Sequence, residues 1–321
     1  MDSSVSKNVS GIVERYAKNR PAAQSAIGFG LIKNTFKNAI EYKGITDGSR
    51  GVLTLIGFTC LSFMIFIIID LLPILAEGLK EPLIFFSSLI FILLFGTFSI
   101  YFFLRCVRME LFRPYDEPII FDRKNRRVHR IYRLVEPGWR GLLRSWPLAS
   151  VSYDWDRIEA EHQAVVNANT STISRTHTLI FNVCKSPIDP TIVDSFTIGS
   201  SMELGEVTVP AVYEHIRRFM EDGGPHLPHG ESTSTSEKPS SFLQCMARTG
   251  PYGENLRKWW QNARILTILG FLLFPVTFPI VTLLGIFSWF SYTTSIPISW
   301  SSEILAEVGQ PTLDSHPEHD K

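Results

Sequence analysis

The residues of this chain whose types suit acid–base chemistry lie mostly in one short segment. Glu159 and Glu161 would share one face of a strand and form a carboxylate pair, with His162 beside them and His177 further along the chain. Such groups can act as general acid and base. No nucleophile elbow, phosphate-binding loop, His-Glu-x-x-His motif or paired-cysteine motif accompanies them. Surface charge is the preferred interpretation, so we expect neither an enzyme nor a bound cofactor.

The remaining histidines and the cysteines lack the spacing of a metal or redox site. His226 and His229 bracket Pro228 in a segment with flanking glycines, which indicates a loop. The four cysteines are far apart in the chain and show no paired spacing: Cys60, Cys106, Cys184 and Cys245. We therefore expect isolated buried thiols and no metal centre.

One group of basic residues has the types and spacing to bind an anionic group. An apolar strand at 118–122, a polar turn and an alternating strand at 127–132 predict a β-hairpin. Its basic residues are Arg123, Lys124, Arg126, Arg127 and Arg130. Such a hairpin can contact an anionic lipid head group or a protein partner. A solvated turn in a basic membrane flank is the simpler interpretation, and we prefer it.

Three long apolar segments decide the class of protein. Residues 51–69, 82–104 and 265–290 contain no Asp, Glu, Lys, Arg or His. Each reaches roughly the 20 residues that a helix needs to cross a bilayer core about 30 Å thick. The first two are joined by residues 77–81 only, which predicts a transmembrane helical hairpin. The chain is therefore expected to be an α+β membrane protein.

The charges flanking the hairpin predict its orientation. Residues 1–50 hold eight Lys or Arg against four Asp or Glu, and Arg105, Arg108 and Arg113 follow the second apolar segment. We expect a multi-pass protein of the bacterial inner membrane. Because Lys and Arg collect on the cytoplasmic side, its N-terminus and residues 105–263 should lie in the cytoplasm.

The third apolar segment allows two topologies. Pro275 and Pro279 lie within it and should kink the helix. The tail after it is acidic, with Glu303, Glu307 and Asp314 among its charges, and this favours a crossing that leaves the tail outside. A re-entrant hairpin with the tail inside remains the alternative.

The polar segments supply the rest of the fold. Residues 22–42 have near-helical apolar spacing and predict an amphipathic helix, either on the membrane or against the cytoplasmic domain. Strands are predicted at 148–155, 178–184 and 195–198, whereas 158–166 suits a strand or a helix. An apolar stripe over 209–220 predicts a closing helix whose Arg217 and Arg218 point away from the core.

Several strands followed by one capping helix have the order of a pleckstrin-homology-like domain. The expected divisions are an N-terminal segment 1–48, hairpin 49–106, pleckstrin-homology-like domain 107–224, flexible linker 225–263, third membrane segment 264–291 and acidic tail 292–321.

Three patches resemble a family of uncharacterised bacterial inner-membrane proteins. They are residues 119–128, residues 213–223, and the late apolar segment followed by 294–300. Members of that family are often encoded beside type VI secretion effectors, including phospholipase and Rhs-type toxins. The resemblance implies an immunity protein that neutralises a toxin by direct binding. A membrane-anchored accessory or lipid-recognising module, or a membrane-perturbing effector, is the alternative. The expected partners are the bilayer and a toxin or secretion protein, not nucleic acid.

Overall fold

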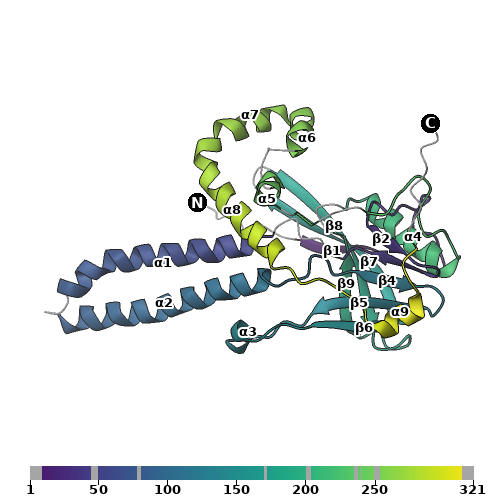
Figure 1. The fold of residues 1–321 in the computed structure, drawn as a ribbon, viewed down its shortest axis with the longest axis horizontal. Coiled ribbons are helices and arrows are strands. Elements are labelled where there is room, and N and C mark those ends of the chain that lie inside the picture. Colours follow the sequence, from purple (N-terminus) through teal and green to yellow (C-terminus); the bar gives the residue numbers. More distant parts are fainter. Residues whose placement is uncertain are drawn as a thin grey trace.

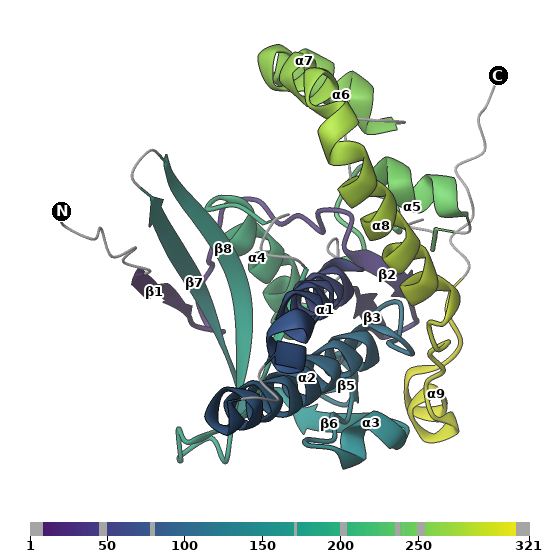
Figure 2. The same cartoon turned by 90° about the vertical axis from the view of Figure 1, so that its left-hand side faces the viewer.

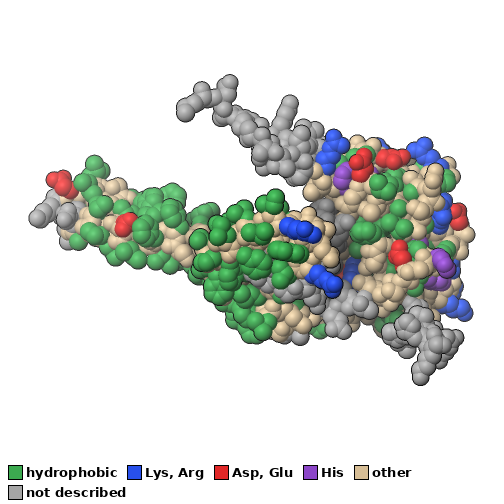
Figure 3. Space-filling model, turned by 90° about the horizontal axis from the view of Figure 1, so that it is seen from above, with side chains coloured by type: hydrophobic (Ala, Val, Ile, Leu, Met, Phe, Trp, Pro, Cys, Tyr) green, Lys and Arg blue, Asp and Glu red, His purple; other side chains and the backbone are tan. Residues whose placement is uncertain are grey.

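The fold combines two antiparallel sheets with a long helical arm. A computed structural model describes residues 9–44, 50–77, 81–169, 172–199, 204–234, 238–239, 241–248 and 254–312. The sheets form a domain at one end, and α1 and α2 extend from it side by side (Figure 1). Hydrophobic side chains cover the arm, while most charged side chains lie on the sheet domain (Figure 3). This arrangement confirms the α+β class.

The first sheet has four strands in the order β1-β7-β8-β9. Their bounds are β1 Val9–Tyr16, β7 Ile158–Asn169, β8 Thr172–Cys184 and β9 Ile192–Ile198. Residues 158–166, which suited a strand or a helix, form a strand because β7 pairs with β8 along its whole length, from Ile158 opposite Val183 to Asn169 opposite Thr172. Figure 2 shows β7 and β8 as the longest strands of the domain.

The second sheet has five strands in the order β2-β3-β4-β5-β6. Their bounds are β2 Ile32–Thr35, β3 Ala39–Tyr42, β4 Ile119–Asp122, β5 Arg127–Arg133 and β6 Leu148–Asp154. The hairpin predicted at 118–132 is confirmed as β4 and β5, with Phe121 opposite Val128. The six strands within the expected domain 107–224 are thus divided between the two sheets.

The amphipathic helix predicted for residues 22–42 is wrong. The segment forms β2 and β3, and β3 pairs with β4 so that Ile40 lies opposite Phe121. Phe29 and Gly30 both have positive φ, at 54° and 65°, a backbone that ends any right-handed helix there. The near-helical spacing arose because a turn and two short strands happen to bury their apolar residues at similar intervals.

The core lies between the two sheets and under helix α4 (Thr208–Glu221). Phe121 of one sheet and Phe181 of the other have ring centroids 5.8 Å apart. The apolar stripe predicted for 209–220 is confirmed, since Tyr213 and Phe219 are fully buried in the same cluster. Arg217, predicted to point away, is instead buried because its guanidinium is bound to the fully buried carboxylate of Glu214.

The helical arm consists of α1 (Val52–Glu77) and α2 (Pro82–Glu110), which confirms the predicted helical hairpin. At 1.5 Å per residue the helices are about 39 and 43 Å long, more than a bilayer core of about 30 Å. The described chain has three helices long and apolar enough to cross a membrane, the third being α8 (Phe274–Thr293).

The third apolar segment is interrupted, as its prolines predicted. Helix α7 (Arg264–Leu272) ends one residue before α8, and Pro275 lies in the first turn of α8, where its missing N–H costs nothing. Pro279 stays inside α8. Figure 1 shows α7 and α8 forming a bend above the arm.

Two further helices lie in the segment expected to be a linker. They are α5 (Phe242–Arg248) and α6 (Glu254–Asn262). Helix α5 packs on α8, where the missing side chain of Gly285 lets Phe242 and Met246 approach closely. Helix α6 precedes α7 along the same bend (Figure 1).

The described part of the C-terminal tail returns to the sheet domain. Helix α9 (Ser302–Val308) places Ile304 and Val308 against Phe36 and Ile120 of the five-stranded sheet. The tail up to Thr312 therefore packs against the sheet domain. Asp314 and the later acidic residues lie outside the described residues, as do residues 78–80 of the hairpin connection.

Candidate functional site

The basic residues of the β4–β5 hairpin, considered as a possible contact for an anionic lipid or a partner, are mostly engaged within the protein. Arg126 pairs with Asp156 at 2.6 Å and with Glu221 at 3.1 Å, and these hydrogen bonds raise its pKa. Arg130 pairs with Asp194 at 2.8 Å, and Arg127 with Glu307 at 3.4 Å. Arg123 lies over the Phe219 ring at 4.7 Å. Only Lys124 is exposed without an ion pair to any described residue.

The same basic hairpin also lies far from the helical arm. Strand β5 begins at its tip, with Arg127, and ends at Arg133, which donates to the backbone carbonyls of Met109 and Leu111 at 3.1 Å each. A seven-residue strand spans about 20 Å. The turn between β4 and β5 is therefore at the end of the sheet remote from α2 (Figure 1). A membrane around the arm would not contact it.

A second basic cluster, which the sequence analysis did not single out as a site, lies where the arm meets the domain. Three guanidinium groups surround the buried Trp146 ring, at 4.7 Å for Arg105, 5.8 Å for Arg108 and 4.4 Å for Arg133. Arg105 and Arg108 are three residues apart on α2 and so share one face. The indole of Trp146 donates to the carbonyl of Gly141 at 2.9 Å, which fixes the ring in place.

The guanidinium groups of this cluster are held by backbone oxygens rather than by carboxylates. Arg105 donates to Glu136 O at 2.8 Å, and Arg108 to Arg144 O at 2.6 Å. None of the three central arginines forms an ion pair with a carboxylate of the described chain. The buried Nε atoms of Arg108 and Arg133 have no hydrogen-bond partner there. The positive charge of the cluster is thus not directly paired within the described chain.

The electrostatics of Arg133 reflect this excess of positive charge. Burial, together with repulsion from Arg108 and Arg113, lowers the pKa of Arg133 to about 10, against the opposing effect of Glu117. The group still remains protonated at neutral pH. An anion placed among these arginines would relieve their mutual repulsion and would supply the acceptors that the unpartnered Nε atoms lack.

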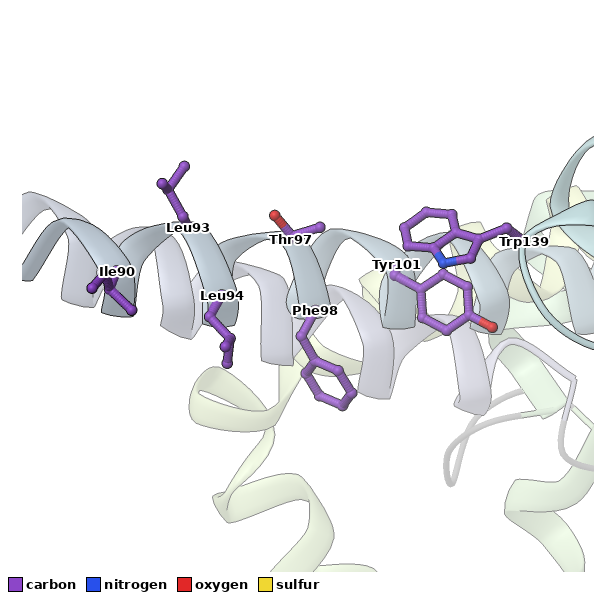
Figure 4. A pocket seen from close by; sticks show the side chains of 7 residues that line it. All are labelled: Ile90, Leu93, Leu94, Thr97, Phe98, Tyr101 and Trp139. Carbon is purple, nitrogen blue, oxygen red and sulfur yellow. The ribbon is translucent and has the colours of Figure 1, made fainter.

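An apolar groove runs along α2 toward this cluster. Its volume is about 620 Å³, and it is lined by Ile90, Leu93, Leu94, Thr97, Phe98, Tyr101 and Trp139. At its end the rings of Tyr101 and Trp139 lie 4.4 Å apart (Figure 4). Arg105 follows Tyr101 by four residues, so the basic cluster begins one helical turn beyond the groove.

The connection between β5 and β6 presents apolar side chains beside the groove. It contains the short helix α3 (Arg140–Leu143), which packs near the end of α2. Trp139 is 60% exposed and Leu143 is 92% exposed. Aromatic rings next to arginines are typical of membrane–water interfaces. An amphiphile with an anionic head group has the chemistry to bind here, because the apolar groove ends in aromatic rings and a cationic cluster lies just beyond them.

The acid–base candidates do not form a catalytic arrangement. Glu161 is nearly buried and pairs with Arg15 at 3.0 Å across to β1. His162 points to the other face of β7, where its Nε2 lies 2.9 Å from Nδ1 of His177. Burial and the proximity of His177 lower the pKa of His162. The carboxylate and the histidine pair are therefore separated by the sheet.

His226, one of the two histidines of the predicted loop, also has ordinary partners. His226 donates from Nε2 to the carbonyl of Lys37 at 3.2 Å and packs on the Phe219 ring at 5.2 Å. The four cysteines are free thiols; Cys106, Cys184 and Cys245 are buried as expected, whereas Cys60 is half-buried.

Comparison with known proteins identifies one family. The model of a family described as "Family of unknown function (DUF6708)" matches residues 96–310. This range includes the end of the groove, the arginine cluster, both helices of the bend and α9. No curated protein and no solved structure matches the chain.

Proposed function

This chain belongs to DUF6708, a family of unknown function, and we propose that it is a membrane-anchored protein that binds an anionic phospholipid where its arm meets the sheet domain. The observation that carries the proposal is the cluster of Arg105, Arg108 and Arg133 around Trp146, at the end of an apolar groove on α2. The groove takes an acyl chain, and the arginines take the phosphate.

The chemistry of the groups supports a phosphate head group. Guanidinium binds phosphate through two parallel hydrogen bonds, and charge-assisted bonds are stronger than neutral ones. Basic pockets next to membrane helices on the cytoplasmic side bind anionic lipids. The Nε atoms of Arg108 and Arg133, which are buried and have no hydrogen-bond partner among the described residues, are donors that a phosphate oxygen would satisfy.

In the proposed orientation the protein lies in a bacterial inner membrane, and its sheet domain lies in the cytoplasm. The start of α1, the end of α2 and the end of α8 all lie next to the domain, and Arg50, Arg105, Arg108 and Arg113 gather there. An excess of Lys and Arg at that level is typical of the cytoplasmic side. Two antiparallel sheets followed by α4 also support a pleckstrin-homology-like fold for the domain.

A thermal-shift experiment tests lipid binding. The full chain, purified in an uncharged detergent, is melted with phosphatidylglycerol or with phosphatidylcholine at equal mole fraction. We expect phosphatidylglycerol to raise Tm, since a ligand at 100 times its Kd stabilises by about 2.7 kcal/mol. The double variant Arg105→Gln/Arg108→Gln should lose most of that shift. Lys124→Gln, which removes an exposed charge remote from the arm, should keep it.

Two further variants separate charge from packing. Arg105→Lys/Arg108→Lys keeps both charges but not the planar fork, and should retain part of the shift. Trp139→Leu shortens the groove end and should weaken the response to lipid without changing Tm in detergent alone, because Trp139 is largely exposed. Equal shifts with both lipids, or an unchanged response in the double glutamine variant, would refute the proposal.

A second candidate is the immunity function implied by the resemblance to proteins encoded beside type VI secretion effectors. The observation that favours it is β1, an edge strand of the four-stranded sheet whose Ile12 and Val13 are about half exposed. An extended segment of a toxin could pair with such an edge. The test is co-purification with the product of the adjacent effector gene, together with the survival of a deletion strain beside effector-armed siblings. Neither association nor self-intoxication would be seen if this candidate is wrong.

A further inference from the structure

Three side chains with metal-binding atoms converge between the five-stranded sheet and α9. Asp122 ends β4, His129 lies in β5 and Glu307 lies in α9, yet one ligand atom from each lies within 4.8 Å of the others. Asp122 and His129 are each 1% exposed, whereas Glu307 faces solvent. The site is thus mostly enclosed and has one open side.

Of the three groups, the imidazole of His129 gives the strongest indication of a metal site. Its Nδ1 lies 2.7 Å from the hydroxyl of Ser152, while its Nε2 is buried with no hydrogen-bond partner among the described residues. Leaving a buried polar atom without a partner costs about 1–3 kcal/mol. A lone pair on Nε2 is what a metal ion requires, and a second bond from Nδ1 fixes the tautomer of histidines that bind metals.

The two carboxylates are placed to complete such a site. Asp122 is held by the side chain of Asn125 at 2.6 Å and by its backbone N–H at 3.3 Å. Glu307 also pairs with the exposed Arg127 at 3.4 Å, through one of its two carboxylate oxygens. Both acids therefore have oxygen lone pairs left for a cation.

We propose that Asp122, His129 and Glu307 bind a divalent transition-metal ion of the zinc class. One imidazole nitrogen and two carboxylate oxygens suit Zn²⁺, with water as the fourth ligand on the exposed side. Imidazole argues against Mg²⁺ and Ca²⁺, which prefer oxygen ligands alone. This inference does not depend on the lipid site, which lies at the opposite end of β5.

The bound ion would fasten the C-terminal segment to the sheet. Helix α9 has only seven residues, and its buried apolar contacts are Ile304 and Val308. Isolated helices of this length are unstable in water. A metal bridge from Glu307 to β4 and β5 would hold α9 in place, and with it the chain that follows α8.

Titration of the metal-free full chain tests the site. Tag-free protein is purified in detergent, treated with a chelator, and titrated with ZnCl2 by calorimetry. We expect one Zn²⁺ per chain and a rise in Tm on binding. CoCl2 should give the visible absorption of a four-coordinate ion. Glu307→Gln removes a ligand from an exposed position, so it should fold and bind Zn²⁺ at least tenfold more weakly.

The matched control is Glu303→Gln, an exposed change one turn earlier on the same helix that should leave affinity unchanged. His129→Gln is the second test of the buried ligand, read by its loss of the cobalt absorption as well as by Tm. Failure of the wild-type chain to bind Zn²⁺, or equal affinity in the Glu307→Gln and Glu303→Gln variants, would overturn the assignment.

Discussion

The carboxylate of Glu110, the last residue of α2, accepts a 2.5 Å hydrogen bond from the hydroxyl of Thr54 in the first turn of α1. It also accepts bonds from the backbone N–H groups of Gly51, Leu53 and Thr54 at 2.9–3.1 Å. The end of one helix thus caps the start of the other. Four N–H groups at a helix start lack partners within the helix, and a negative charge there is favourable.

Replacing Glu110 by glutamine should destabilise the arm. The amide has one acceptor oxygen instead of two and adds two donors in a site already crowded with donors. We expect a loss of about 1–3 kcal/mol and a clear fall in Tm of the protein in detergent. Glu81→Gln is the control, because Glu81 precedes α2 without forming a side-chain cap and should be neutral. Equal Tm values for the two variants would contradict the capping role.

Gly51 should not tolerate alanine. Its φ is +92°, and an added Cβ would lie 2.6 Å from the backbone nitrogen of Ser288 in α8. The backbone strain alone costs about 1–3 kcal/mol, and the clash would separate α1 from α8. We expect poor yield or a strongly lowered Tm for Gly51→Ala. Gly96→Ala meets only Ile68, at 3.8 Å, so it should be stable.

Arg217→Met should be among the most damaging single changes in the domain. Burial alone would raise the pKa of Glu214, but hydrogen bonds from Arg217, Ala22 and Arg218 outweigh it and lower that pKa to about 2. Removing Arg217 leaves a buried carboxylate without its main partner, which costs about 3–5 kcal/mol. Equilibrium unfolding should show the loss. Arg218→Met touches the same carboxylate from a half-exposed position and should cost much less.

Stability should fall in mild acid because of His215. Its Nδ1 lies 2.5 Å from the Tyr42 hydroxyl, and its Nε2 donates to the carbonyl of Pro225 at 3.1 Å. Burial lowers the pKa of His215 from 6.5 to about 4, against the opposing effects of Pro225 and Glu231. The unfolded chain therefore takes up the proton first, so the stabilisation is complete above pH 6.5 and decreases as pH falls toward about 4.

The full loss from this group is about 3 kcal/mol. It can be measured as the difference in free energy of unfolding between wild type and His215→Gln across that pH range. The variant should be less stable at neutral pH and should show a shallower decline in acid. His226→Gln, a change at a neighbouring and more accessible histidine, should keep the wild-type slope. A wild-type slope in His215→Gln would assign the acid sensitivity to other groups.

Some features of this protein follow from the sequence because they depend on neighbouring residues. The apolar segments at 51–69 and 82–104 are long and free of charge, and such segments form helices wherever the backbone must satisfy its own hydrogen bonds. The hairpin of β4 and β5 has its turn within a few residues, and the stripe on α4 repeats with the helical period.

Other features were decided only when distant parts of the chain met. Residues 32–42 form two strands because β3 pairs with β4, a strand that follows the whole helical arm in the sequence. Arg217 was expected in solvent, since the pattern of one helix cannot reveal that the distant N-terminal segment covers this face, with the backbone N–H of Ala22 bound to Glu214 and the carbonyl of Lys18 bound to Arg217. The arginines around Trp146 come from α2 and β5, and Glu307 reaches His129 from α9. Periodicity records which face of an element is buried, whereas a site requires that several elements be placed within a few ångströms, which only tertiary packing fixes.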